Sequence, residues 1–359
     1  MKVSRLIIVI VVVVLIVLVA LVAISTLAPS SPSSTAWQSA VGYPIQVGGS
    51  YGIGGQQCNS TGQYVFCVGG TDPAGGPRSE VYSSSAITSS GNITGWKPDA
   101  NAYPGDIANQ SCVASSNYVY CVGGTYDASY DDSYYTYFAP VNSNGTVGHW
   151  TQTTSYPIAV DTESCVASSG YIYCVGGYNE TDGTSADTLA SYSVWFAPIS
   201  SSGIGNWTQT TSYPSDVYLP NCAAGGGYIY CIGGVNDDAN PVSTDYYAAL
   251  SSSGVGAWSQ TTSYPVSASG QSCVISGGNI YCVGGEKQSS FATAVYFASV
   301  SSTGVGKWSQ ASSYPAAADT DCVVVSGNLY CVGGFEGSSS EVNDVFFAPL
   351  SSLTSTTTG

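Results

Sequence analysis

The twelve cysteines have the most distinctive chemistry in this sequence, and they occur as six pairs with one spacing. In each pair the second cysteine follows the first by nine positions, and Val or Ile and then Gly-Gly come after it. Zinc sites use cysteines two to four residues apart, gathered in fours. Because these pairs instead recur about every fifty residues, the spacing favours disulfides over a metal site. The predicted disulfides are Cys58–Cys67, Cys112–Cys121, Cys165–Cys174, Cys222–Cys231, Cys273–Cys282 and Cys322–Cys331.

The nine-residue spacing fits an antiparallel hairpin. Folding Cys165 onto Cys174 leaves Ser169 and Gly170 as a two-residue turn, and glycine readily supplies the positive φ that such a turn needs. Counted outward from the turn, the cysteines fall at a non-hydrogen-bonded pair, where Cα atoms lie roughly 4.5 Å apart. We therefore expect one disulfide within each of the six hairpins. Such bonds form in oxidising compartments.

Each cysteine hairpin is the first half of a longer repeat. It is followed by an aromatic run such as Val295 to Val300, and then by a tryptophan segment that ends at Tyr-Pro. The tryptophans are Trp37, Trp96, Trp150, Trp207, Trp258 and Trp308. Four short strands in a unit of about fifty residues are typical of a β-propeller blade. The sequence thus predicts an all-β, six-bladed propeller of four-stranded antiparallel blades.

The Gly-Gly after the second strand, with Tyr and Trp later in each unit, resembles the kelch repeat and the central domain of galactose oxidase. The resemblance covers Trp37 to about Leu350, although the interval from Phe138 to Trp150 is longer than in kelch and each blade has its own disulfide. The copper chemistry of galactose oxidase needs two histidines, and this chain has one. The chain enters on a tryptophan strand and leaves on an aromatic strand, so we expect the first segment to complete the last blade and remove its exposed edge.

The N-terminus predicts a membrane anchor. Residues 6–24 are apolar without interruption and follow Lys2 and Arg5. This run is longer than a signal-peptide core, about 20 such residues span a bilayer, and the basic flank stays in the cytosol. We expect a cytosolic stub (1–5), a transmembrane signal-anchor (6–24), a Ser/Pro-rich stalk (25–36), the propeller (37–350) and a Ser/Thr-rich tail (351–359). The protein would be a single-pass protein of the cell membrane with an extracellular propeller, or secreted if the N-terminal segment is cleaved.

The composition is that of an exported protein. Charged residues make up 8% and the net charge is −16, so the surface would repel phosphate backbones and we expect no nucleic-acid partner. Glycosylation sequons stand at Asn59, Asn92, Asn109, Asn144, Asn179 and Asn206. We therefore expect a glycoprotein of the cell surface.

The acidic residues concentrate in two classes of loop. Fifteen of the 22 lie between the second and third strands of the repeats or beside those loops: Asp72, Glu80, Asp127, Asp131, Asp132, Glu180, Asp182, Asp187, Asp237, Asp238, Asp245, Glu286, Glu336, Glu341 and Asp344. Six more lie between repeats: Asp106, Asp161, Glu163, Asp216, Asp319 and Asp321. Both classes open on the same face of a four-stranded meander, so one face should be acidic. Solubility alone would also place charge on long loops, and that alternative stays open.

Three functions would use such a face. The first is binding of a cell-surface protein or glycan, since loops on a rigid scaffold commonly carry recognition. The second is calcium binding through carboxylate oxygens, for which the candidates are Asp127, Asp131, Asp132, Glu180, Asp182, Asp187, Asp237 and Asp238. The third is hydrolysis of a carbohydrate by a pair of carboxylates. No nucleophile–base motif is present, so we expect a binding or scaffold module, with no catalytic residue assigned and no cofactor other than calcium.

Overall fold

The computed structural model describes residues 36–126, 131–179, 190–288, 290–316, 318–336 and 340–354. The predicted stub, the predicted anchor and nearly all of the predicted stalk lie outside these ranges. Among the residues that the structure describes, no helix is long and apolar enough to cross a membrane.

The six cysteine hairpins form as predicted. In the third hairpin Cys165 is the cross-strand partner of Cys174. The turn residues Ser169 and Gly170 have φ values of 51° and 82°. The two-residue turn therefore sets the register that places the cysteines opposite each other.

All six predicted disulfides are present, and each joins the two cysteines of one hairpin. The Cα atoms of each pair lie 4.0 to 4.1 Å apart, somewhat closer than the roughly 4.5 Å of an ordinary non-hydrogen-bonded pair. Each disulfide holds together two adjacent strands and links no separate parts of the fold. The bonds are Cys58–Cys67, Cys112–Cys121, Cys165–Cys174, Cys222–Cys231, Cys273–Cys282 and Cys322–Cys331.

Each hairpin supplies the first two strands of an antiparallel sheet, and the aromatic and tryptophan segments supply the third and fourth. Sheet 1 has β4 (Gln57–Thr61), β5 (Tyr64–Val68), β6 (Val81–Ser84) and β7 (Trp96–Pro98); sheet 2 has β9 (Ser111–Ser115), β10 (Tyr118–Val122), β13 (Thr136–Pro140) and β14 (Thr151–Gln152). Sheet 3 has β15 (Ser164–Ser168), β16 (Tyr171–Val175), β17 (Val194–Ser200) and β19 (Thr208–Gln209); sheet 4 has β20 (Asn221–Gly225), β21 (Tyr228–Ile232), β22 (Tyr246–Ser251) and β24 (Ser259–Gln260). Sheet 5 has β25 (Ser272–Ser276), β26 (Asn279–Val283), β29 (Val295–Ser301) and β31 (Ser309–Gln310); sheet 6 has β32 (Ala318–Val325), β33 (Asn328–Glu336), β35 (Val345–Pro349) and β1 (Gln38–Ser39).

Additional two-residue strands lie in the turns and loops that connect the main strands. In the turns between third and fourth strands lie β18 (Gly203–Ile204), β23 (Gly254–Val255) and β30 (Gly304–Val305), and the helix α2 (Leu350–Leu353) follows β35. In the loops at the opposite ends of the sheets lie β2 (Gln46–Val47), β3 (Ser50–Tyr51), β8 (Ile107–Ala108), β11 (Thr125–Tyr126), β12 (Asp131–Asp132), β27 (Glu286–Lys287), β28 (Ser290–Phe291) and β34 (Ser340–Glu341).

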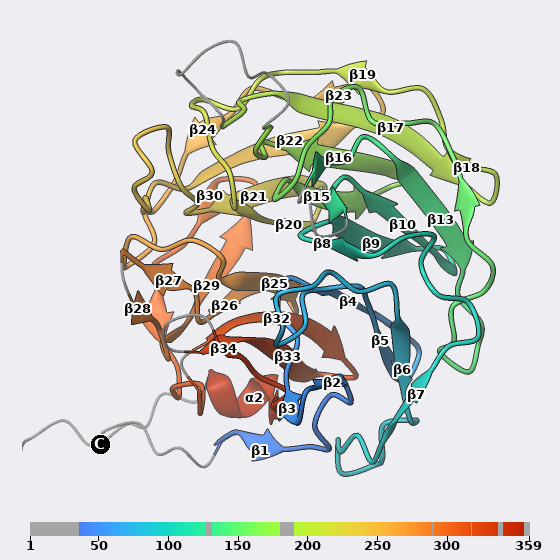
Figure 1. The fold of residues 1–359 in the computed structure, drawn as a ribbon. Coiled ribbons are helices and arrows are strands. Elements are labelled where there is room, and N and C mark those ends of the chain that lie inside the picture. The colour runs from blue at the N-terminus through green and yellow to red at the C-terminus, as the bar shows by residue number, and fades with distance from the viewer. Residues whose placement is uncertain are drawn as a thin grey trace, which may run out of the picture. The chain divides into compact units, whose positions relative to one another are not determined.

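The first strands of the sheets lie around a common centre (Figure 1). β4 contacts β9, β9 contacts β15, the series continues through β20, β25 and β32, and β32 contacts β4. The hydrophobic core is accordingly divided into clusters, each between two neighbouring sheets. The fold is thus all-β and propeller-like, as the sequence predicted.

Sheet 6 is assembled from both ends of the described chain. β1 pairs with β35 in the register Gln38 to Phe347 and Ser39 to Phe346, and the other three strands come from the last repeat. The N-terminal segment therefore completes the last sheet, as expected from the order of the repeats. The edge of β35, which would otherwise expose unpaired backbone groups, is covered.

An aromatic pair fastens each sheet to the one before it. The tryptophan of one sheet packs edge-to-face on the Tyr of the preceding Tyr-Pro, with ring centroids 4.9 to 5.0 Å apart at all six interfaces. Aromatic pairs of this geometry contribute about 0.5–1.5 kcal/mol beyond the burial of their area. Trp37 packs on Tyr314 and Trp96 packs on Tyr43, so the N-terminal segment makes these contacts with both neighbours.

A ring of hydrogen bonds also joins the first strands. The residue before the first cysteine of one sheet accepts a hydrogen bond from the backbone N–H of the first cysteine of the next. Asp321 accepts from Cys58 and so closes the ring between the last sheet and the first. Elsewhere Ser111 accepts from Cys165, Ser164 from Cys222, Asn221 from Cys273 and Ser272 from Cys322, all at 2.8 to 2.9 Å, and Gln57 accepts from Cys112 at 3.4 Å.

We expect Asp321→Ala to lower the free energy of unfolding by about 1–3 kcal/mol, because it leaves the buried Cys58 N–H without its acceptor. Asp321→Asn is the matched control, since Asn221 performs the same task in sheet 4. The measurement is urea unfolding with the disulfides intact. Equal losses in the two variants would show that the closing hydrogen bond is not what Asp321 contributes.

Candidate functional site

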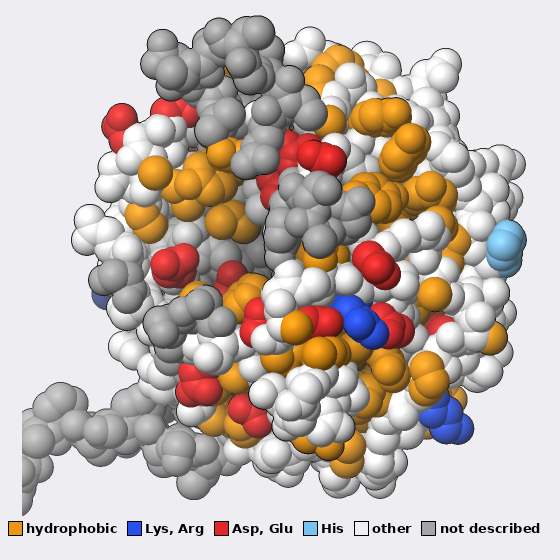
Figure 2. Space-filling model, viewed as in Figure 1, with side chains coloured by type: hydrophobic (Ala, Val, Ile, Leu, Met, Phe, Trp, Pro, Cys, Tyr) orange, Lys and Arg blue, Asp and Glu red, His pale blue; other side chains and the backbone are white. Residues whose placement is uncertain are grey.

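The two classes of acidic loop lie side by side at one end of the sheets. β8, from the loop between sheets 1 and 2, pairs with β11, from the loop between the second and third strands of sheet 2. Single bridges make the same connection elsewhere, among them Asp161 to Tyr178 and Ser269 to Glu286. The loops therefore share one face, as predicted. Figure 2 shows many acidic and few basic side chains on the face in view.

A cavity of about 240 Å³ opens within this face, at the centre of the ring. It is lined by the starts of the six first strands and by the residues that lead into them. A second cavity of about 350 Å³ lies at the other end of these strands, and its lining includes Val166, Ala223 and Val274 together with Asn59 and Ser60. The polar cavity on the acidic face is the candidate site.

The two cysteines of each predicted disulfide differ in their position relative to the polar cavity. The first cysteines of all six pairs lie in its wall. The second cysteines are fully buried one strand further out and line neither cavity. The disulfides therefore stiffen the wall of the candidate site without offering a free thiol to it. The buried second cysteines are Cys67, Cys121, Cys174, Cys231, Cys282 and Cys331.

Glutamines two positions before the first cysteine form part of the wall of the polar cavity. Each donates its side-chain amide to a backbone carbonyl oxygen in the second strand of the neighbouring sheet. These hydrogen bonds link neighbouring sheets at three of the six interfaces around the cavity. Gln56 donates to Val332 at 2.6 Å, Gln110 to Val68 at 2.8 Å and Gln271 to Ile232 at 2.8 Å.

Glu163 occupies the glutamine position in sheet 3. A Cβ built on Gly123, the residue after Val122, would lie 2.7 and 2.9 Å from the two carboxyl oxygens of Glu163, much as one built on Gly69 would lie 3.1 Å from Gln110 Nε2. The carboxyl thus stands where the other sheets place an amide donor, and only a protonated carboxyl can donate to a carbonyl oxygen. Burial raises the pKa of Glu163 well above its usual range, and the charges of nearby aspartates raise it further.

Two aspartates of sheet 6 also line the polar cavity. Burial raises the pKa of Asp319 to about 8, with added repulsion from Glu286 and Asp321. Burial raises the pKa of Asp321 to about 7, opposed by its hydrogen bonds from Cys58, Cys322 and Ser272. Asp321 is therefore held by the ring of hydrogen bonds, whereas Asp319 lies against Gly270.

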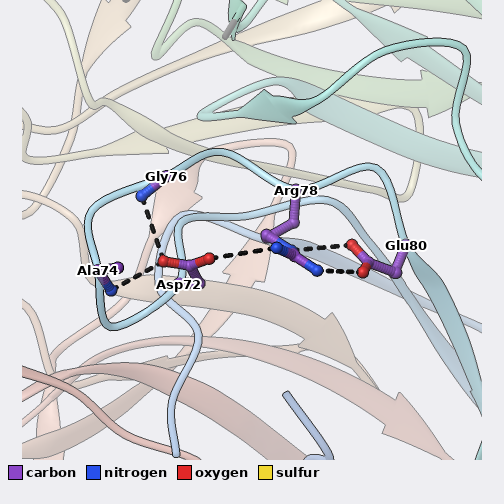
Figure 3. Close-up of polar contacts among 5 residues, drawn as sticks. All are labelled: Asp72, Ala74, Gly76, Arg78 and Glu80. Atoms are coloured by element: carbon purple, nitrogen blue, oxygen red, sulfur yellow. Dashed lines mark hydrogen bonds and ion pairs between the residues drawn. The ribbon is translucent and has the colours of Figure 1, made fainter. Parts of the chain in front are cut away.

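The basic side chain in the loop of sheet 1 is already neutralised (Figure 3). Arg78 pairs with Glu80 through Nε at 3.0 Å and through Nη2, and its Nη1 lies 3.4 Å from Asp72. Asp72 is buried and also accepts hydrogen bonds from the backbone of Ala74 and Gly76. This arrangement braces the loop and leaves the acidic character of the face unchanged.

The calcium candidates are only partly within the described residues. Asp131, Asp132, Asp237 and Asp238 are described, and Asp127, Glu180, Asp182 and Asp187 lie outside. In the described part of the chain, no three His, Cys, Asp or Glu side chains gather closely enough to hold a metal ion. Calcium binding stays a prediction.

The predicted glycosylation sites differ in their surroundings. Asn144 and Asn206 are exposed or half-exposed in turns between third and fourth strands. Asn59 lies in β4 and lines the second cavity, where its amide donates to Cys112 and accepts from Ala114. Of the remaining sites, Asn92 and Asn179 are half-buried, and Asn109 lines the polar cavity.

The two polar positions before the first cysteine were missed in the sequence analysis. A signal for them exists, because alignment of the repeats on that cysteine gives one column of Gln, Gln, Glu, Pro, Gln and Thr and a second of Gln, Ser, Ser, Asn, Ser and Asp. Polar columns beside a buried strand indicate a hydrogen-bonding task that recurs in every repeat.

No protein-family model and no curated protein matches the chain. Among solved structures, 773 chains match, so the fold is widely shared and does not by itself identify a function. One of them, described as the structure of YjhT, has a TM-score of 0.67 and 12% sequence identity, with 85% of this chain and 95% of that chain covered. At this identity the likeness shows the fold alone.

The buried carboxyls predict a stability that falls as pH rises. Glu163, Asp245, Asp319 and Asp321 all have folded-state pKa values raised by burial, whereas unfolded carboxyls titrate near pH 4. Their contribution is therefore fully present below about pH 4 and is lost as the pH rises through the folded values. We expect a lower Tm at pH 8 than at pH 5, with a slope of at most about 1.4 kcal/mol per pH unit for each group.

Glu163→Gln should reduce this loss of stability at high pH, because a buried amide does not ionise. Gln110→Glu is the matched control and should add a similar loss at the equivalent place in sheet 2. Thermal unfolding of the three proteins between pH 5 and pH 8 measures both effects. If Tm fell with pH by the same amount in the native protein and in Glu163→Gln, the interpretation that Glu163 is protonated in the folded state would be wrong.

Proposed function

We propose that the chain is a cell-surface binding module. In this proposal it is a kelch-like, six-bladed propeller closed by its N-terminal strand, held to the membrane by residues 6–24, with the propeller outside the cell. It recognises a protein or glycan through the acidic loop face. The observation that carries the proposal is that both classes of acidic loop pair on one face, around the polar cavity.

The disulfides support the extracellular location. All twelve cysteines are in disulfide bonds and none of them is free, a state that persists in oxidising compartments and is rare in the cytosol. The low share of charged residues, 8%, leaves a hydroxyl-rich surface that suits an exported protein.

Binding is favoured over the carbohydrate hydrolase because of what the cavity carboxyls do. A glycosidase needs one carboxylate as a base or nucleophile and one as an acid, both facing the substrate. Glu163 is packed into the interface between sheets 2 and 3 against Gly123, and Asp321 is engaged by the Cys58 N–H. These two carboxyls serve the scaffold, so Asp319 is the one carboxyl left among the described residues that line the cavity, and a single carboxyl does not make the pair that hydrolysis needs.

The binding proposal is tested by affinity capture from native cell envelopes with the tagged full chain in mild detergent. The matched variant carries Asp→Asn at Asp131, Asp132, Asp216, Asp237 and Asp238, which removes charge without changing side-chain size. We expect a partner that the native chain retains and the variant loses. If both retain the same set, or neither retains anything, the acidic face serves solubility only.

The glycoprotein proposal predicts a specific pattern of occupancy. We expect glycan on Asn144 and Asn206, because both lie in turns at the surface, and none on Asn59, because its side chain is hydrogen-bonded inside the ring. Mass spectrometry of glycopeptides from the membrane-derived protein measures each site. Glycan on Asn59, or bare Asn144 and Asn206, would contradict the pattern.

A further inference from the structure

Two neighbouring sheets present an exposed tyrosine at the same position of the repeat. The backbone carbonyls of Tyr134 and Tyr192 accept hydrogen bonds from the N–H groups of Tyr156 and Tyr213, and their side chains are 46% and 52% exposed. The repeat needs no aromatic residue here, and Tyr134 has a second exposed tyrosine, Tyr135, next to it. In the other four sheets the same hydrogen bond is made by Ser79, Ser243, Thr293 and Asn343.

Tyr134 stands at the end of a chain of ring contacts that reaches the core. Its ring lies 4.5 Å from that of Tyr135, which in turn contacts the ring of Tyr137 at 6.5 Å. Tyr137 contacts Tyr103 at 5.3 Å, and Tyr103 packs on the buried Trp150. A ring held in this way loses little conformational entropy when a partner binds.

Carboxylates lie close to the loops that carry the two exposed tyrosines. Asp131 is exposed and is the cross-strand partner of Tyr126, whose ring contacts Tyr135. In sheet 3 the backbone N–H of Tyr192 faces the Asp216 carboxyl, and the Asp237 carboxyl lies against it. Burial and the neighbouring Asp237 raise the pKa of Asp216. Two carboxyls in contact repel each other when both are charged, and a cation placed between them would remove that repulsion.

We propose that Tyr134, Tyr135 and Tyr192, together with Asp131, Asp216 and Asp237 of the same loop face, dock a Lys/Arg-bearing polypeptide segment. This inference rests on the proposed function and specifies the chemistry of its partner. Guanidinium groups stack on tyrosine rings and form paired hydrogen bonds with carboxylates. The net charge of −16 would steer a basic segment towards the molecule, and tyrosine supplies the contact area common in binding hot spots.

The test uses the full chain in detergent micelles and a fluorescent twelve-residue peptide of alternating Arg and Ser at physiological salt. The test variant is Tyr134→Ser with Tyr192→Ser, which installs the residue that sheets 1 and 4 carry at this position, so the backbone hydrogen bonds are preserved. The control variant is Tyr51→Ser, which removes a tyrosine of similar exposure (51%) on β3. We expect the double variant to weaken binding about tenfold, the size of two exposed stacking contacts, and the control to leave it unchanged.

Each other outcome overturns the proposal in a distinguishable way. If the double variant binds the peptide as the native chain does, while the Asp→Asn variant loses it, the acidic face binds cations without the tyrosines, and the proposed function stands. If chitohexaose binds the native chain and loses affinity in the double variant while the arginine peptide is unaffected, the tyrosines dock a neutral glycan instead. If neither probe binds, or the control variant loses as much affinity as the double variant, the tyrosines dock no basic segment.

Discussion

The structure depends on closure of a ring of sheets. The backbone is the one covalent link between the sheets. Every disulfide lies within one sheet, so cohesion between sheets rests on the six tryptophan–tyrosine pairs, the clusters of apolar side chains and the ring of hydrogen bonds to cysteine N–H groups. Each interface is repeated almost unchanged around the ring. Loss of one would expose apolar side chains of two sheets at once, because neighbouring sheets share their core.

Closure of the ring depends most on sheet 6, because its strands come from both ends of the described chain. β1 pairs with β35, and Trp37, just before β1, shares a core cluster with Ala348 and Leu350. Trp37 also reaches back to sheet 5, where it packs on Tyr314 and donates to the Ser312 carbonyl. The Asp321 hydrogen bond to Cys58 then ties the last repeat to the first. The first described segment of the chain therefore fastens the last sheet to both of its neighbours.

Much of the architecture was predictable because its determinants are local. The nine-residue cysteine spacing fixes a hairpin, the turn residues fix its register, and four such strands in each repeat leave few ways to pack. The roles of Asp321 and Glu163 were not predictable from one repeat, because each acts on a neighbouring sheet and its charge is an exception to a column of neutral residues. The segment 6–24 and four of the calcium candidates lie outside the described residues, and the sequence remains the basis for them.

In a repeat protein, each residue can be compared with the residues at the same position of the other repeats. This comparison separates the features that the scaffold needs from those that have another cause. A residue that recurs at one position around the ring is explained by the scaffold, as the tryptophans and the glutamine amides are. A residue that differs from its counterparts in the other repeats and destabilises the fold needs a separate explanation. Glu163 puts a buried ionisable group where an amide suffices, yet it faces the interior of an interface, so its consequence is for stability. Tyr134 and Tyr192 put aromatic surface into solvent where serine suffices, and they do so in two adjacent sheets, in loops close to carboxylates. Under the proposed function, a cationic partner that covers these rings and carboxylates would offset both costs.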